Sequence, residues 1–351
     1  MNEIIYTTPA EQIEKLKCQN LIIEDENMAK NTLLLFGYSN LIKSYREPYL
    51  IVSEGKKMYR SGVSFNQLVS LYLLDKNLRN AVMASMIDLE EHIKEAAADV
   101  IAQSFGVHVD EYLRFRNYSN KRKRKYRFTL NGILETMNNT LNTDKDPIHH
   151  YHTEHGVVPP WILFKSVYFS TMVNFIDQFK MPQKNELVNK MYDLNTLNIS
   201  YDSARMLLMD TLSICMEYRN LAAHGGRTYN YICDSSLRVN EIFKPKHEID
   251  ITGFSQLLFV LRMLNYDNPF YYLSNTLNEE VSRHCSKYPQ DVTYLGQILN
   301  IDIVPQDLVY VSNLSKKYHS NPHCSGIKNS VPLELEIAKE QGYIPCKRCY
   351  K

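Results

Sequence analysis

Apolar residues recur at helical spacing through most of the chain. In the longest periodic stretch, from Ser64 to Gly106, they return every three or four positions, and the glycine suits a helix end. Further apolar helical runs lie at 161–179, 204–216 and 253–283. The sequence shows no alternation of strands and helices and no glycine-rich phosphate-binding loop. The pattern predicts an all-α body and disfavours nucleoside-triphosphate chemistry.

The first fifty residues carry two helix starts. Thr8 is a candidate N-cap, followed by Pro9 at the first helical position and by Glu11, which completes a capping box. A second start is expected near Asp25, and Pro48 should end the helical region. We expect these residues to pack as helices.

The most concentrated set of polar residues follows the helical run 204–216 and spans Arg219 to Asn230. On a continuous helix Arg219 and His224 would point to different faces, whereas Asn220, His224 and Arg227 would share one stripe. The pair Gly225-Gly226 makes an unbroken helix improbable. Either a break in the helix brings Arg219 round to His224, or a second protomer completes the site.

These residue types suit chemistry on a phosphodiester. A histidine exchanges protons near neutral pH, an arginine matches phosphate oxygens, and an amide can orient either group. Together they would support attack of a ribose 2′-hydroxyl on the neighbouring phosphate without a metal. The alternative is structural, because Arg and His near a helix end often only cap carbonyl groups and favour the helix dipole.

Composition limits where a nucleic acid could bind. The chain has 351 residues, 44% hydrophobic and 23% charged, with a net charge of +1. A phosphate-binding function must therefore rest on local basic patches. No signal sequence and no apolar run long enough to span a bilayer are visible, so we expect a cytoplasmic protein without a membrane partner.

A basic run supplies such a patch. Six of its seven residues are positively charged, and asparagines before it indicate a loop. The run could contact an RNA backbone while its tyrosine stacks on a base, or it could be a solvated surface. Its residues are Lys121, Arg122, Lys123, Arg124, Lys125, Tyr126 and Arg127.

The C-terminal tail has metal-ligand spacing. Cys346 and Cys349 are separated by two residues, and His319 and Cys324 would complete a closed Cys3His site for a structural zinc ion. His323 is an alternative to His319, and reduced cysteines without metal are the alternative to the site. Residues 303–317 before it indicate a linker or a short strand.

The polar stretch resembles known ribonucleases. Arg219 and His224 match the Arg-x4-His motif of HEPN-domain ribonucleases, and the longer pattern through Arg227 and Asn230 resembles the Abi-like (abortive infection) proteins of bacteria. Further similarity includes Gly37-Tyr38, and it covers roughly residues 6–303. The resemblance implies a HEPN-type helical bundle, a role in phage defence, and dimerisation across a shared cleft. Abi-like proteins also carry a Glu and a basic residue at the places of Glu90 and Lys94, so Glu90 could brace the site.

The tail resembles a second module, the metal-binding domain of the Ada repair protein, and this match favours His319 over His323 as ligand. We therefore expect an Abi-like HEPN domain at 1–303, a linker at 304–314 and a zinc-binding module at 315–351. Zinc is expected as a structural cofactor only.

The resemblance and the chemistry together predict a metal-independent endoribonuclease of an anti-phage system. Arg219, Asn220 and His224 are the expected catalytic residues, and Arg227, Tyr229, Asn230 and the basic run are the expected RNA contacts. The alternative is a non-catalytic RNA-binding protein that forms a ribonucleoprotein with a cognate noncoding RNA. A homodimer is expected in either case.

Overall fold

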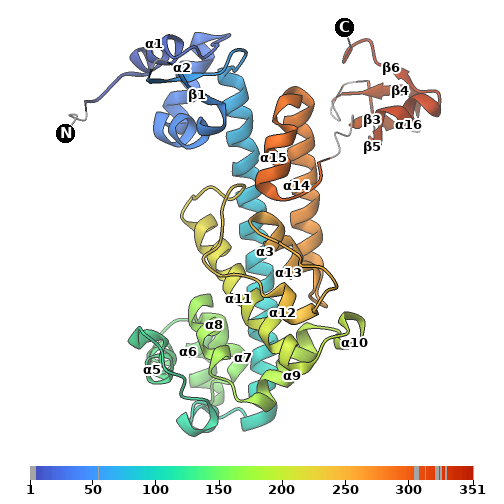
Figure 1. Cartoon of the computed structure of the whole chain (residues 1–351). Coiled ribbons are helices and arrows are strands. Elements are labelled where there is room, and N and C mark those ends of the chain that lie inside the picture. The colour runs from blue at the N-terminus through green and yellow to red at the C-terminus, as the bar shows by residue number, and fades with distance from the viewer. Residues whose placement is uncertain are drawn as a thin grey trace. The chain divides into compact units, whose positions relative to one another are not determined.

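A computed structural model describes residues 5–53, 55–303, 308–312, 314–320, 324, 326–328 and 330–350. The chain is mostly helical, with 63% helix and 7% strand, as the all-α prediction requires of the body. The elements are drawn in Figure 1. The α-helices are α1 (Pro9–Cys18), α2 (Glu26–Phe36), α3 (Phe65–Phe105), α4 (Val109–Tyr112), α5 (Leu130–Leu141), α6 (Ile148–His150), α7 (Pro160–Leu163), α8 (Phe169–Asp177), α9 (Met181–Met191), α10 (Leu194–Leu197), α11 (Tyr201–Ala223), α12 (Val239–Phe243), α13 (Phe254–Arg262), α14 (Asn268–Lys287), α15 (Val292–Leu299) and α16 (Leu335–Glu340).

Both predicted helix starts near the N-terminus are confirmed. The backbone N–H of Thr8 donates to a carboxylate oxygen of Glu11 at 2.7 Å, while the N–H of Glu11 donates to Oγ1 of Thr8 at 3.3 Å. Asp25 caps α2 by accepting from the N–H of Met28 at 2.9 Å. These side chains satisfy N–H groups that the first helical turn leaves without partners.

A hairpin interrupts the helices after Pro48, and the sequence analysis did not predict it. Strands β1 (Leu50–Ser53) and β2 (Lys56–Tyr59) pair antiparallel. Three of the four residues of β1 are exposed, so the strand lacks the alternation of buried and exposed positions that marks a strand in a sequence.

The predicted long helix is α3. It runs unbroken from Phe65 to Phe105 and ends at Gly106, whose φ of +84° lies in the left-handed region that glycine adopts without strain. Most of the predicted apolar positions are buried, but Ile87 is 44% exposed. An apolar residue of the periodic face is therefore open to solvent at the middle of α3.

Two other predicted helical runs are each divided. The run 161–179 forms α7, a 3-10 turn at Phe164–Ser166 and α8, because Tyr168 is extended with ψ of 145°. The run 253–283 forms α13 and then α14, which begins at Asn268. Apolar residues continue across the first break and do not locate it. The second break lies at Asn265, Asp267 and Pro269, which are turn residues that the prediction of a single helical run overlooked.

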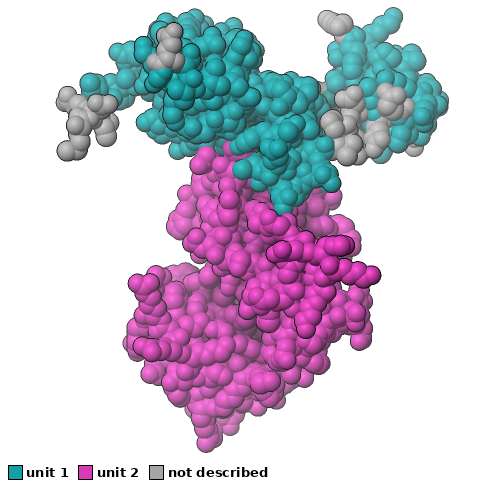
Figure 2. Space-filling model, in the orientation of Figure 1, with its two compact units in different colours: residues 1–77, 277–351 teal, residues 78–276 magenta. Residues whose placement is uncertain are grey.

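The chain divides into two compact units, coloured separately in Figure 2. Unit 1 comprises 1–77 and 277–351, and unit 2 comprises 78–276. In unit 2, α11 packs against α8, α9, α12 and α13, and its apolar face is buried. Among the described residues, no helix is both long and apolar enough to cross a membrane.

Unit 1 contains a buried polar network. The carboxylate of Asp291, 2% exposed, accepts hydrogen bonds from Tyr49 at 2.8 Å and from Gln67 at 2.9 and 3.0 Å, and it lies 2.8 Å from Nε2 of His284. Nδ1 of His284 is 2.9 Å from Oγ of Ser70. These bonds hold α14 and the following turn to α3, and burial without partners would be costly for each group.

The tail forms a small sheet of order β5-β3-β4-β6. Its strands are β3 (Leu308–Ser312), β4 (Ser315–His319), β5 (Val331–Glu334) and β6 (Ile344–Pro345). Strand β3 lies where the sequence indicated a linker or short strand, and 304–307 and 313 lie outside the described residues. The sequence-based domain boundaries at 303 and 315 remain predictions.

Candidate functional site

The predicted break in the polar stretch occurs at the end of α11. His224 is the C-cap residue, and Gly225 follows with φ of +71°. The backbone N–H groups of Gly225 and Gly226 donate to the carbonyls of Ala222 and Leu221 at 3.1 and 2.9 Å. Because α11 continues to Ala223 and His224 is its C-cap, Arg219 remains on the helix, and the spacing of five residues places the two residues on different faces.

The carbonyl groups of this turn are capped by a side chain of α3 that also belongs to unit 2. Nη1 of Arg79, on α3, lies 3.4 Å from the carbonyl oxygen of Gly225 and 3.3 Å from that of Gly226. In the described part of the chain, neither Arg219 nor His224 donates a side-chain hydrogen bond to a helix carbonyl. The guanidinium of Arg79 therefore takes the capping role that the sequence analysis considered for Arg219 and His224.

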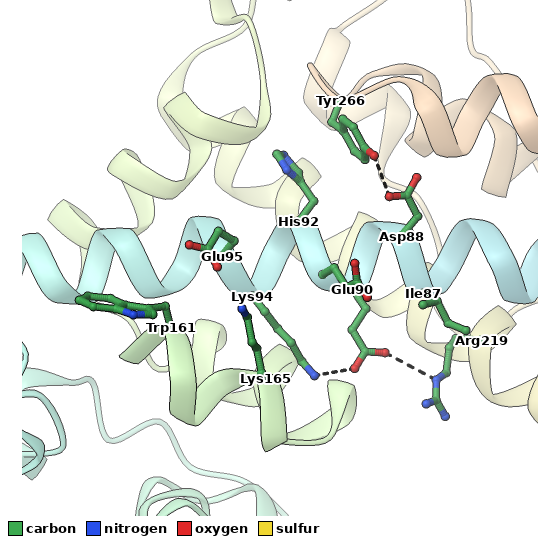
Figure 3. Close-up of a pocket in the computed structure, with 11 residues that line it drawn as sticks. Ile87, Asp88, Glu90, His92, Lys94, Glu95, Trp161, Lys165, Arg219 and Tyr266 are labelled. Carbon is green, nitrogen blue, oxygen red and sulfur yellow. Dashed lines mark hydrogen bonds and ion pairs between the residues drawn. The ribbon is translucent and has the colours of Figure 1, made fainter. Parts of the chain in front are cut away.

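Arg219 instead faces an ion pair on α3. Nζ of Lys94 lies 2.7 Å from one carboxylate oxygen of Glu90, and Nε of Arg219 lies 3.8 Å from the other (Figure 3). Glu90 and Lys94 are 13% and 10% exposed, and Arg219 is 31% exposed. At 3.8 Å the contact is ionic without a hydrogen bond, so Glu90 attracts the guanidinium, and no described residue accepts a hydrogen bond from its N–H donors.

A pocket of about 840 Å³ opens beside this ion pair. Figure 3 shows its lining residues, which come mainly from α3, with Arg219 from α11 and further residues from α7 and the loop before α14. The exposed Ile87 belongs to the lining. The lining residues are Ile87, Asp88, Glu90, Glu91, His92, Lys94, Glu95, Trp161, Lys165, Arg219 and Tyr266.

The pocket also contains an aromatic pair. The rings of His92 and Tyr266 stack with centroids 4.6 Å apart, and the Tyr266 hydroxyl donates to Asp88 at 2.7 Å. Burial lowers the pKa of His92, although the charge of Asp88 opposes that shift. At neutral pH the imidazole is therefore uncharged, and its buried Nε2 has no hydrogen-bond partner in the described parts of the chain.

The segment after the polar stretch is fixed by two acidic residues of α11 that the sequence analysis did not single out. The carboxylate of Glu217 accepts from the backbone N–H groups of Asp234 and Ser235 at 2.8 and 2.9 Å and from the Tyr231 hydroxyl at 3.0 Å. Asp210 binds the guanidinium of Arg238 at 2.6 Å. The acidic residues Asp210 and Glu217, which lie within and directly after the apolar run 204–216, were the signal in the sequence that could have indicated these contacts.

The expected RNA contacts of this stretch differ in accessibility. Asn220, His224 and Arg227 are exposed, and Asn230 is half-buried. The side chain of Tyr229 is fully buried. Its ring is therefore not accessible to a base, and the expected RNA contact of Tyr229 is wrong.

The basic run 121–127 is a loop with a 3-10 turn at its end, and part of it is already paired. Lys121 and Lys123 lie 2.8 and 2.6 Å from the two oxygens of Asp177, which also lies 3.4 Å from Lys184. Burial alone would raise the pKa of Asp177, but these lysines hold it at about 2. The remaining cations of the run, Arg122, Arg124, Lys125 and Arg127, are exposed.

The predicted tail ligands do converge. The ligand atoms of His319, Cys324, Cys346 and Cys349 all lie within 4.8 Å of one another. Nδ1 of His319 is 3.7 Å from Sγ of Cys349. The alternative ligand His323 lies outside the described residues. The four groups could hold one metal ion.

The donor set fits a metal ion. His319 is fully buried, and its Nε2 has no hydrogen-bond partner among the residues that the structure describes. Burial lowers the pKa of its imidazole, with a contribution from Lys317, so the ring is available as a neutral ligand. The backbone N–H of Arg348 lowers the pKa of the Cys346 thiol, which favours the thiolate that a metal binds.

A match to one known protein family identifies the family of this chain. A family model of Abi-like proteins matches residues 31–230, more than half of the chain. The chain belongs to the Abi-like family. The match includes the whole stretch from Arg219 to Asn230, and it is shorter than the range 6–303 expected from the sequence.

Membership indicates a role of this Abi-like protein in abortive infection. No curated protein and no solved structure matches the chain. The tail with its His and Cys cluster lies outside the part that the family model matches.

Proposed function

We propose that this Abi-like protein is a metal-independent endoribonuclease of a bacterial abortive-infection system, built on a HEPN-type core. The observation that carries the proposal is the state of Arg219. Its guanidinium lines an open pocket, and none of its donors is hydrogen-bonded within the described chain. An arginine held by one distant carboxylate, with its planar set of donors unused, suits a phosphate group.

The roles follow from this arrangement. Arg219 binds the non-bridging oxygens of the scissile phosphate and stabilises the charge that develops on them. His224 accepts the proton of the 2′-hydroxyl or donates one to the leaving 5′-oxygen. Asn220 orients the imidazole or the phosphate, and Glu90 with Lys94 fixes the guanidinium. Cleavage leaves a 2′,3′-cyclic phosphate and a 5′-hydroxyl.

Because Arg219 and His224 leave α11 on different faces, the proposal includes a homodimer. In a symmetric pair, Arg219 of one protomer and His224 of the other bind the same phosphodiester. The exposed cations of the loop 121–127 hold the RNA backbone, together with Arg227 and Asn230. The tail binds a structural zinc ion, for which three thiolates and one imidazole form a typical closed set.

The separation of Arg219 from His224 within one chain also favours a second candidate function. The same surface would then bind a cognate noncoding RNA as a ribonucleoprotein without cutting it. The two candidate functions predict different outcomes when RNA is mixed with the purified protein. The first predicts cleavage of the RNA, and the second predicts binding without cleavage.

The test is cleavage of RNA by the full chain in buffer without Mg²⁺, with the product ends identified by mass spectrometry. His224→Ala should lower the cleavage rate by about 100- to 10,000-fold, the usual range for loss of a general acid or base. His247→Ala, which changes another exposed histidine of unit 2, is the matched control and should cut normally. Tight binding of one transcript without any cleavage would instead establish the ribonucleoprotein.

A further inference from the structure

The pocket beside Arg219 has two chemically different ends. Arg219, Lys94 and the exposed Lys165 supply positive charge, and Lys165 has no ion pair within the described chain. The other part of the lining is acidic and aromatic. Figure 3 shows Glu90, Lys94 and Arg219 joined on one side of α3 and the His92–Tyr266 pair on another.

The acidic end has acceptors that nothing in the described chain uses. Glu91 and Glu95 are exposed and form no ion pair or hydrogen bond there. They are four residues apart on α3, a spacing at which like charges destabilise a helix. Asp88 uses one oxygen for Tyr266 and keeps acceptor capacity on the other.

A second observation points to a missing ligand. Nε of Arg219 and Nε2 of His92 are both buried atoms that no described residue hydrogen-bonds, and both residues line this pocket. Buried polar atoms normally have partners. An anionic group would supply a partner for the guanidinium, and a polar group in the plane of the imidazole would supply one for Nε2 of His92.

We propose that this pocket binds the nucleotide next to the scissile phosphodiester and selects guanine over uracil. This inference rests on the proposed function. The phosphate lies at the cationic end, and the base stacks against the His92–Tyr266 pair. Its Watson–Crick edge faces the side chains of Glu91 and Glu95, whose carboxylate oxygens are hydrogen-bond acceptors.

The selectivity follows from the pattern of donors on each base. Guanine presents a ring N–H and an amino group side by side, which match the two oxygens of one carboxylate. Uracil presents one N–H between two carbonyl oxygens, and these would face negative charge. Adenine and cytosine, with one amino group beside an acceptor, should rank between them.

The chain provides its own reporter for the test. Trp161 is the only tryptophan of the protein and lines the pocket. Guanosine 3′-monophosphate should change its fluorescence at concentrations about tenfold lower than uridine 3′-monophosphate, the discrimination expected from one mismatched polar contact. The double variant Glu91→Gln/Glu95→Gln should remove the difference, whereas Glu186→Gln, an exposed change on α9, should retain it.

Mapping of the cut sites in a random RNA gives the second readout. Guanosine should be enriched beside the cut for the wild type and not for the double variant. Equal responses to both nucleotides, with RNA still cut, would overturn the base subsite and leave the nuclease intact. Guanosine-selective binding without any cleavage would support the subsite and overturn the nuclease.

Discussion

The sequence predicted a cluster of functional side chains in two regions, the tail and the end of α11. The structure brings the predicted side chains together only in the tail. In the tail, His319, Cys324, Cys346 and Cys349 converge within 4.8 Å. At the end of α11, Arg219 and His224 point apart, and no hydrogen bond or ion pair joins them in the described chain. A closed metal site needs all its ligands from one fold, whereas a site for a long polymer can remain open until a substrate or a second protomer arrives.

Loss of one tail ligand should give the largest effect. Cys346→Ser leaves three ligands, and because a structural zinc ion contributes on the order of 10 kcal/mol to the folding of small modules, residues 308–350 should lose protection from hydrogen exchange. Metal content of the purified chain, measured by mass spectrometry, should fall from one ion per chain to none. Cys18→Ser, at an exposed site in α1, is the control. A wild-type tail that is protected without any bound metal would contradict the prediction.

Mixing two inactive variants tests whether the open site is shared. Arg219→Ala and His224→Ala should each be inactive alone. In a mixed dimer one composite site keeps both residues, so random exchange should restore about a quarter of the wild-type rate. If each chain instead cuts with its own two residues, the mixture should remain as inactive as its components.

Asp177 and the lysines around it, Lys121, Lys123 and Lys184, form a third cluster of charged side chains, and all four residues belong to unit 2. Its folded pKa of about 2 lies below the ordinary value of 3.8. The carboxylate therefore contributes about 2 kcal/mol of stability above roughly pH 4, and this is lost as the pH falls through 2. Lys184, whose pKa burial lowers to about 8, stays protonated across this range and does not alter the slope. Thermal unfolding between pH 2 and 5 should show the loss for the wild type and a smaller one for Asp177→Asn.

Glu90→Gln should test whether the charge of Glu90 holds the guanidinium of Arg219 in place. The variant keeps the shape of the side chain but removes the charge that both Lys94 and Arg219 face. We expect kcat/KM for RNA to fall by about tenfold, because a mobile guanidinium is less often in position. Restoration of the rate by Glu90→Asp, with Glu186→Gln unchanged, would separate a role of the charge from general destabilisation. An unaltered kcat/KM in Glu90→Gln would exclude a positioning role.

The smallest effect is expected on the basic loop. Arg122→Ala/Arg124→Ala removes two exposed cations, so RNA affinity should fall severalfold and the slope of log K against log salt should decrease by about 1.4. Lys121→Ala/Lys123→Ala removes cations that are paired with Asp177 and should change the slope less. Filter binding at several salt concentrations measures both, and equal slopes would show that the pairing with Asp177 does not matter.

Local signals in the sequence predicted much of the helical body. The capping residues Thr8 and Asp25, the long periodicity of α3 and the Gly225-Gly226 break all act within a few residues, and the structure confirms them. The tail cluster was predicted from the short spacing of Cys346 and Cys349 together with the resemblance that favoured His319, and its convergence is confirmed. That it holds zinc stays a prediction.

What the sequence did not predict depends on contacts between distant segments. The pocket combines residues of α3 with Trp161, Arg219 and Tyr266, and no local pattern links them. The hydrogen bond from the backbone N–H of Ser235 to Glu217 and the ion pair of Lys121 with Asp177 also join residues far apart in the chain. The break within 161–179 was missed because apolar residues continue across it, whereas the break within 253–283 was marked by Asn265, Asp267 and Pro269 and was overlooked.

The contact of Arg79 with the turn after His224 has a consequence for the evolution of the family. A guanidinium at position 79 can cap this turn only where a helix ends and exposes carbonyl oxygens to it. In relatives whose helix continues past the histidine, those oxygens would be used internally. The identity of position 79 and the presence of the glycine pair should therefore covary among relatives.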